Sequence, residues 1–307
     1  MFASRHSPLL LLLSVTVLQA QDPHCHAWPP DMRVDSDLVL INTLVTDQQG
    51  RVITGLDPSR FRIFENGKEQ AIRDCISEDV PVSVGVVLDA SLSMSDKLEL
   101  MKQAAIRFVR AANPADEYFL VEFEARPRVV LHFTTDANQL LQSIAHIAAG
   151  GSTALFDAVH LAVQEMRYAS NPRKALVIVS DGMDNHSRHH ERETKRLVSE
   201  IDFPIYAINL WQPRHGNRYA IQRQDPATLE TISAPTGGRT FAVRDLKKLP
   251  AVTELISMEI RHEYVLGYVP QDRMLDGRFH KVRVRIDPLH GDRFRISNRA
   301  GYYSRTL

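Results

Sequence analysis

The chain has 307 residues, enough for one large domain or two modest ones. Its apolar fraction of 44% and charged fraction of 24% are ordinary for a protein that buries a core. Lysine plus arginine and aspartate plus glutamate both number 37, so the formal net charge is zero. This balance argues against a nucleic-acid partner or a polybasic membrane patch, because both need an excess of one sign.

The first twenty residues predict a secretory signal peptide. Arg5 gives a positive start, residues 9–18 form an apolar core, and Ala20 ends the segment with a small residue. The alternative is an uncleaved anchor, but the apolar run is shorter than the roughly 18 residues that a spanning helix needs. No later segment is long and apolar enough to span. We therefore expect a secreted, periplasmic or extracellular protein without a membrane span after signal cleavage.

Residues 21–79 predict a polar lead followed by a small β unit. Residues 38–46 are rich in Val, Ile, Leu and Thr, which are typical of strands, and residues 47–50 predict a turn into a returning strand at 51–54. Residues 61–64 and 70–73 flank Asn66-Gly67, the dipeptide that favours a tight hairpin.

From about residue 80 the pattern changes to alternating strands and helices. Residues 84–88 form a continuous apolar run, as expected for a parallel strand buried on both faces. Further strands are predicted at 118–123, 175–179 and 204–210, with an antiparallel edge strand at 128–133. Helical spacing predicts helices from Lys97 to about 110 and at 136–148, 155–168, 189–200 and 246–261. Residues 80–262 therefore predict an α/β fold with a doubly wound, mostly parallel sheet.

Residues 263–307 return to a β pattern. Short strands are predicted at 264–269, 281–286 and 294–296. Small β segments thus flank the α/β domain at both ends, and each alone is marginal in size. We hypothesise that the two segments share one sheet or sandwich.

Carboxylate and hydroxyl side chains follow the predicted buried strands. Asp89, Ser91 and Ser93 come directly after the first strand, and Asp181 follows another within Ser180-Asp181-Gly182. Thr153 ends a glycine-rich loop that opens a helix. In an open α/β sheet, ligands bind outside the carboxyl ends of the strands, near the point where the strand order reverses. We therefore expect these loops to converge on one crevice.

Oxygen donors without His or Cys form a hard-donor set. Such a set suits Mg²⁺, Mn²⁺ or Ca²⁺ and disfavours zinc or copper. Two carboxylates balance the charge of a divalent ion, and neutral hydroxyls leave the ion electrophilic. If the protein supplies five groups, some through water, one octahedral position stays open for an outside oxygen.

This pattern resembles the von Willebrand factor A domain and its metal-ion-dependent adhesion site over residues 80–262. The resemblance implies that Ser91, Ser93 and Thr153 touch the metal, while Asp89 and Asp181 bind it directly or through water. Leu92 departs from the family, in which many members have Gly there. The flanking β segments look like those of a branch of secreted bacterial proteins with this domain.

The resemblance implies a binding module in which a divalent ion bridges to a carboxylate on a protein partner, with no catalytic residues. One alternative is a metal-dependent hydrolase that uses the ion as a Lewis acid. However, the predicted site offers no general base beyond Asp89 and Asp181, which are committed to the metal. Another alternative is a structural part of an envelope or secretion assembly.

Other residues have competing interpretations. Asp157 could hold metal-bound waters, or it could favour the first turn of its helix. His186, His189 and His190 invite a zinc site, and His24-Cys25-His26 a copper site, but polar runs of this kind are more often solvated. The Asp-x-Ser-x-Ser run alone could be a helix N-cap.

Export would place the two cysteines, Cys25 and Cys75, in an oxidising compartment, where we predict that they pair. Closing a loop of this size would stabilise the fold by about 4 kcal/mol in the chain-entropy model. Free-thiol labelling of the exported, denatured protein should find none. Two labelled cysteines per chain would rule the disulfide out.

Overall fold

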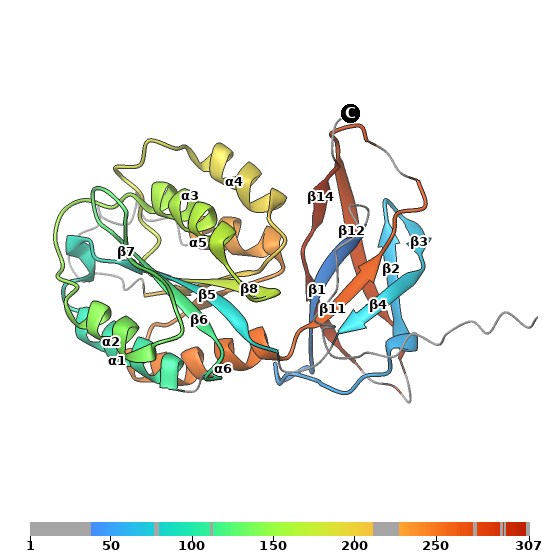
Figure 1. Ribbon diagram of the computed structural model, residues 1–307, viewed down its shortest axis with the longest axis horizontal. Coiled ribbons are helices and arrows are strands. Elements are labelled where there is room, and N and C mark those ends of the chain that lie inside the picture. The colour runs from blue at the N-terminus through green and yellow to red at the C-terminus, as the bar shows by residue number, and fades with distance from the viewer. Residues whose placement is uncertain are drawn as a thin grey trace, which may run out of the picture.

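The computed structural model describes residues 38–76, 80–110, 113–210, 227–272, 275–288, 291 and 293–304. These residues form an α/β unit beside a β-sandwich (Figure 1). The predicted signal peptide and the His24-Cys25-His26 run lie outside the described residues. Cys75 is fully buried and disulfide-bonded. Because Cys25, the other cysteine of the sequence, also lies outside the described residues, the pairing of the two stays a prediction.

The sandwich is built from both ends of the described chain. Its first sheet has the order β13-β1-β11-β4 and its second the order β14-β12-β2-β3. The strands are β1 (Val39–Thr46), β2 (Phe61–Glu65), β3 (Lys68–Gln70), β4 (Ile72–Ile76), β11 (Tyr264–Tyr268), β12 (Phe279–Ile286), β13 (Arg295–Asn298) and β14 (Gly301–Tyr303). β1 pairs with β11 and β13, and β2 pairs with β12. The hypothesis that the two β segments share sheets is therefore confirmed.

The turns of the N-terminal segment were predicted with mixed success. The hairpin is confirmed, because Asn66 and Gly67 join β2 to β3 with φ angles of 49° and 86°. The prediction of a returning strand at 51–54 was wrong, since only a single bridge, Thr46 to Val52, forms there. β11 pairs with β1 over Val39–Thr43, so on that edge only the end of β1 is open to the returning chain.

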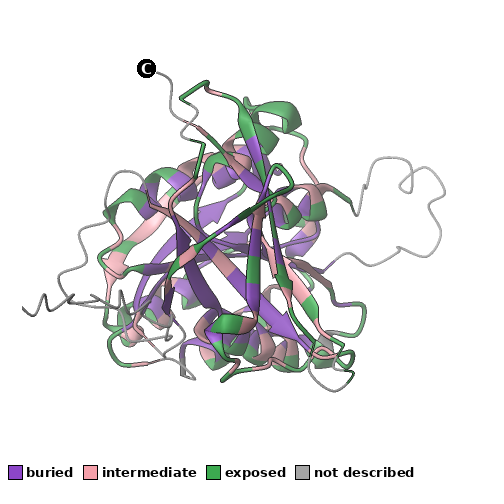
Figure 2. Ribbon diagram, turned by 90° about the vertical axis from the view of Figure 1, so that its right-hand side faces the viewer, coloured by how far each residue is buried: buried purple, intermediate pink, exposed green. Residues whose placement is uncertain are grey.

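Alternation along the strands creates the core of the sandwich. In β12 the exposed residues Lys281, Arg283 and Arg285 alternate with the buried Val282 and Val284. Figure 2 shows this alternation on the strands that face the viewer. The buried side chains of the two sheets meet in one cluster: Ile41, Val45, Phe61, Ile63, Cys75, Tyr264, Leu266, Tyr268, Val282 and Val284.

The α/β unit has one six-stranded sheet with the order β10-β9-β8-β5-β6-β7. Its strands are β5 (Val82–Asp89), β6 (Glu117–Phe123), β7 (Arg128–Thr134), β8 (Arg173–Ser180), β9 (Ile205–Asn209) and β10 (Thr240–Ala242). All neighbours pair in parallel except β6 and β7. The doubly wound, mostly parallel sheet and its antiparallel edge strand are confirmed.

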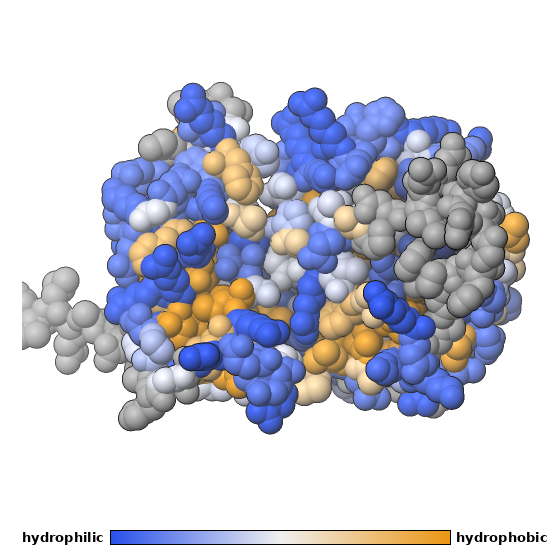
Figure 3. Space-filling model, turned by 180° about the vertical axis from the view of Figure 1, so that it is seen from behind, coloured by the Kyte–Doolittle hydropathy of each residue, from blue (hydrophilic) through white to orange (hydrophobic). Residues whose placement is uncertain are grey.

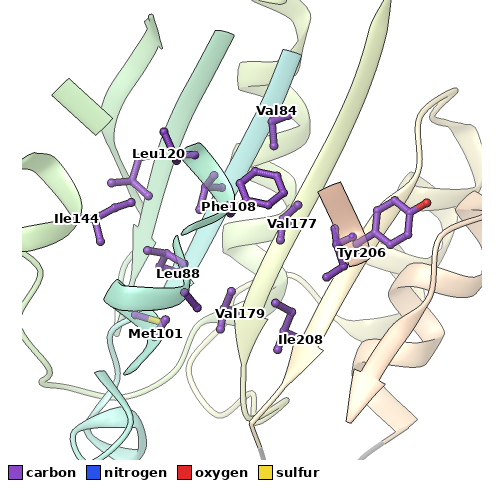
Figure 4. Close-up of a cluster of buried hydrophobic side chains, with 14 of the residues drawn as sticks. Val84, Leu88, Met101, Phe108, Leu120, Ile144, Val177, Val179, Tyr206 and Ile208 are labelled. Atoms are coloured by element: carbon purple, nitrogen blue, oxygen red, sulfur yellow. The ribbon is translucent and has the colours of Figure 1, made fainter. Parts of the chain in front are cut away.

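Helices cover both faces of this sheet (Figure 1). They are α1 (Leu98–Arg110), α2 (Ala137–Ala145), α3 (Leu155–Glu165), α4 (Glu191–Glu200), α5 (Ala227–Ser233) and α6 (Leu249–Arg261). Side chains of α1, α2 and α6 pack on one face, where Met101, Phe108 and Ile144 meet Leu88 and Val179 (Figure 4). Those of α3, α4 and α5 pack on the other face. The short elements α5, β10 and β14 were not predicted.

The face of the molecule seen in Figure 3 is mostly hydrophilic, and its hydrophobic side chains gather in separate patches. Within the described residues, the structure contains no helix with the length and apolar character needed to cross a membrane.

A buried polar cluster joins α6 to the sandwich. Glu263, directly before β11, accepts hydrogen bonds from the Tyr206 hydroxyl at 3.0 Å and the Asn42 amide at 3.2 Å. The Arg173 guanidinium donates to the Glu263 carbonyl at 3.1 Å. Burial raises the pKa of Glu263 to about 7, against the lowering effects of the Arg173 charge and these hydrogen bonds.

We predict that Glu263 makes stability depend on pH. Its folded pKa lies above its ordinary value of 4.5, so its contribution is complete below pH 4.5 and is lost as the pH rises through about 7. The loss is at most roughly 3 kcal/mol. Glu263→Gln should flatten the decline in Tm between pH 5 and 8 in calorimetry. The exposed Glu254→Gln on α6 is the control, and equal slopes for both variants would contradict the assignment.

Candidate metal site

The strand order places the ends of β5 and β8 side by side. From β5 the chain runs to β6 and β7 on one side, and then returns to place β8 on the other side. β5 and β8 pair in parallel from Val82–Arg173 to Leu88–Val179. The residues that follow, Asp89 and Ser180, therefore lie together at the point where the strand order reverses.

Asp89 is fully buried at this edge. One carboxylate oxygen accepts the Ser91 backbone N–H at 2.9 Å, and the other accepts the Ser180 hydroxyl at 2.6 Å. Burial raises the pKa of Asp89 to about 6; hydrogen bonds from Ser180 and Ser91 oppose this effect, and the charge of Asp181 adds to it. A nearby cation would favour the charged form of this carboxylate.

The two serines and the glycine-rich loop lie against each other. The hydroxyls of Ser91 and Ser93 are 3.1 Å apart, at the start of a 3₁₀ turn over Leu92–Met94. The Gly150 N–H donates to the Ala90 carbonyl at 2.8 Å, and the Leu92 N–H donates to the Gly151 carbonyl at 3.3 Å. These backbone bonds fix the loop that carries Thr153 over the loop that carries the serines.

Thr153 and Asp181 are both buried and belong to neighbouring loops. The Thr153 N–H donates to the Asn185 side chain at 2.9 Å, and its carbonyl accepts the N–H groups of Asn185 and His186. Asp181 accepts the Met183 N–H at 3.3 Å. The loops that carry Asp89, Ser91, Ser93, Thr153 and Asp181 are thus joined at one edge of the sheet.

Lys97 adds a buried positive charge that sequence reasoning missed. Its ammonium lies 3.9 Å from an Asp181 oxygen and donates to the Ser93 carbonyl at 3.4 Å. Its side chain is only 7% exposed, so the ion pair is shielded from water. No pattern in the sequence distinguishes Lys97 from the other lysines that begin helices.

The sequence analysis also failed to identify Ser180 and Asn185 as positioning residues. Ser180 bonds to Asp89, and Asn185 bonds to Thr153. Their place directly after an apolar strand, around Asp181, was the available signal.

Asp157 holds a loop of the protein. It accepts hydrogen bonds from the backbone N–H groups of Arg188 and His189 and from the His189 ring at 2.7 Å. Burial alone would raise the pKa of Asp157, but these hydrogen bonds and the His189 charge lower it below its ordinary value. In the described part of the chain, no three His, Cys, Asp or Glu side chains gather in a way that could hold a metal ion.

The donors at the strand ends fit a hard divalent ion in their chemistry. Two buried carboxylates and three hydroxyl residues supply only oxygen, and hydrogen bonds from Ser180 and Ser91 favour the anionic form of Asp89 against the cost of burial. If a metal binds, Ser91, Ser93 and Thr153 would offer hydroxyls, and Asp89 and Asp181 would offer charge.

Fold and site together define an α/β domain with buried oxygen donors at its switch point. Residues 84–183 match the model of the von Willebrand factor type A domain. The resemblance to this family that the sequence predicted is therefore confirmed over residues 84–183.

Individual relatives share the fold at low identity. The von Willebrand factor type A structure from Catenulispora acidiphila is 13% identical with a TM-score of 0.52, covering 87% of this chain and 74% of that one. Proximal thread matrix protein 1 from the mussel byssus is 16% identical with a TM-score of 0.50, covering 64% and 50%. An uncharacterized protein of Borreliella burgdorferi is 25% identical over 182 residues, 54% of this chain. The chain spans 52%, about half, of the length of this curated relative.

We predict that Lys97 competes with a divalent ion for the crevice. Lys97→Met should lower the Tm measured in EDTA, because it leaves Asp181 without its buried cation. It should also tighten Mg²⁺ binding about ten-fold, because less positive charge opposes the ion. Lys102→Met, in the helix α1 that begins directly after Lys97, is the matched control in calorimetric titration. A Lys97 variant that binds Mg²⁺ as weakly as the control would contradict the competition.

Proposed function

We propose that this chain is a secreted, metal-dependent protein-binding module. A Mg²⁺, Mn²⁺ or Ca²⁺ ion held by Asp89, Ser91, Ser93, Thr153 and Asp181 would bind a carboxylate of a protein partner. The observation that carries the proposal is the buried Asp89 at the switch point, bonded to Ser180 and followed by two hydroxyls 3.1 Å apart. Neutral hydroxyls leave a bound ion electrophilic enough to take an outside oxygen.

A binding role fits the domain and its relatives. A von Willebrand factor type A domain fits an adhesion or protein-binding module, and one similar structure is by its name a matrix protein of the mussel byssal thread. The predicted signal peptide supports an extracellular or periplasmic location for such contacts.

We further propose that the module is not an enzyme. The carboxylates of the crevice have other tasks, since Asp89 is bonded to Ser180 and Ser91 and Asp181 lies beside Lys97. Neither is then available as a general base. Turnover of phosphate-ester or peptide substrates with Mg²⁺, abolished by Asp89→Ala, would instead establish the hydrolase alternative.

We predict that Mg²⁺ or Mn²⁺ binding depends more on Asp89 than on Ser91. Asp89→Ala removes one of two compensating charges, whereas Ser91→Ala removes a neutral donor that water can replace. Titration calorimetry should show a larger loss of affinity for Asp89→Ala. Asp89→Ala should stay folded, because removing this carboxylate relieves its repulsion with Asp181 in the absence of metal. Ser91→Ala should stay folded because it removes only a neutral donor.

Thermal unfolding measured beside the titration separates folding from binding. Wild-type protein with no divalent-ion heat and no metal-dependent change in Tm would defeat the proposed function. Unchanged ion binding by Asp89→Ala would show that the ion sits elsewhere.

A further inference from the structure

A positively charged pocket lies beside the proposed metal site. It has a volume of about 440 Å³ and lies between the turn after β6 and the first turns of α3. Arg126, Arg188, His160, His186 and His189 line it, together with Asp157. The pocket therefore gathers two guanidiniums and three imidazoles around one carboxylate.

The single carboxylate does not neutralise the two arginines. Asp157 already accepts hydrogen bonds from the backbone N–H groups of Arg188 and His189 and from the His189 ring. The exposed guanidiniums of Arg126 and Arg188 have no ion pair with any described carboxylate. Both groups are free to bind an outside anion through charge-assisted hydrogen bonds.

The histidines form a rigid wall of this pocket. The rings of His160 and His189 stack with centroids 3.7 Å apart and an interplanar angle of 14°. His189 is fixed by Asp157, and the His160 ring lies 3.3 Å from the Thr194 hydroxyl of α4. Because these partners hold the rings, the wall is preorganised for a ligand.

The pocket lies a short distance from the proposed metal site. Asp157 lies in the first turn of α3, and Thr153 lies two residues before this helix begins, so the two are only four residues apart in the chain. Asn185 bonds to Thr153, and its neighbour His186 lines the pocket. Allowing for the reach of an arginine side chain, the two anion-binding points are on the order of 10 Å apart, the length of three residues of extended chain.

We propose that this pocket takes a second acidic side chain of the protein partner, three residues from the carboxylate that binds the metal. The inference rests on the proposed metal-dependent function and adds to it the partner's chemistry. The preferred ligand is an extended segment with two acidic residues separated by two others.

Two fluorescein-labelled peptides test this spacing by fluorescence anisotropy in Mg²⁺: Gly-Asp-Gly-Gly-Asp-Gly and Gly-Asp-Gly-Gly-Asn-Gly. Wild-type protein should bind the two-acid peptide at least ten-fold more tightly. The double variant Arg126→Gln/Arg188→Gln should lose this preference while it keeps its affinity for the one-acid peptide and its Mg²⁺ titration curve. A merely structural role for the arginines would weaken both peptides together and lower the Tm.

A matched variant controls for charge. Arg107→Gln/Arg167→Gln removes the same charge from exposed positions on α1 and just after α3, and it should keep the full preference. The proposal would be contradicted if the Arg126/Arg188 variant kept the preference for the two-acid peptide, or if wild-type protein lacked this preference. If wild-type protein still binds the two-acid peptide in EDTA while the Arg126/Arg188 variant does not bind it, the result supports the acid-binding pocket and contradicts the metal-bridging function.

Discussion

The parallel pairing of β5 with β8 is the constraint on which the site depends. Both strands are buried apart from Lys174, so their carboxyl ends are where the chain can present polar groups. The register from Val82–Arg173 to Leu88–Val179 brings Asp89 to Ser180, although 91 residues separate them. The glycine-rich loop, fixed to Ala90 and Leu92 by backbone hydrogen bonds, completes the same edge.

Charge at these strand ends must be balanced because the carboxylates are buried. Asp89 and Asp181 are buried together, and the charge of Asp181 adds to the burial that raises the pKa of Asp89. Hydrogen bonds from Ser180 and Ser91 stabilise one carboxylate, and the Lys97 ammonium compensates the other. A crevice built in this way favours cations, and the nearby pocket with Arg126 and Arg188 favours anions. This arrangement of charge supports the proposed bridging ion and the proposed acidic partner.

The sandwich holds the α/β domain at both of its ends. The domain is inserted between β4 and β11, and these two strands pair with each other from Val265–Ile76 to Tyr268–Ile72. Entry and exit of the chain are therefore adjacent. Glu263, at the exit, is bonded to Tyr206 of the α/β sheet and to Asn42 of the sandwich, so one buried side chain ties the two units together.

The sequence by itself determined the elements whose pattern is local. The apolar run at residues 84–88 predicted a buried strand, Asn66-Gly67 predicted a hairpin, and the Asp-x-Ser-x-Ser run marked the proposed metal site. Only the tertiary structure decided what depends on distant partners. Residues 51–54 form only one bridge because β11 pairs with β1 over Val39–Thr43, a competition that the local sequence does not encode. Lys97 likewise became part of the crevice only because burial brings its ammonium to Asp181, 84 residues away in a chain of 307.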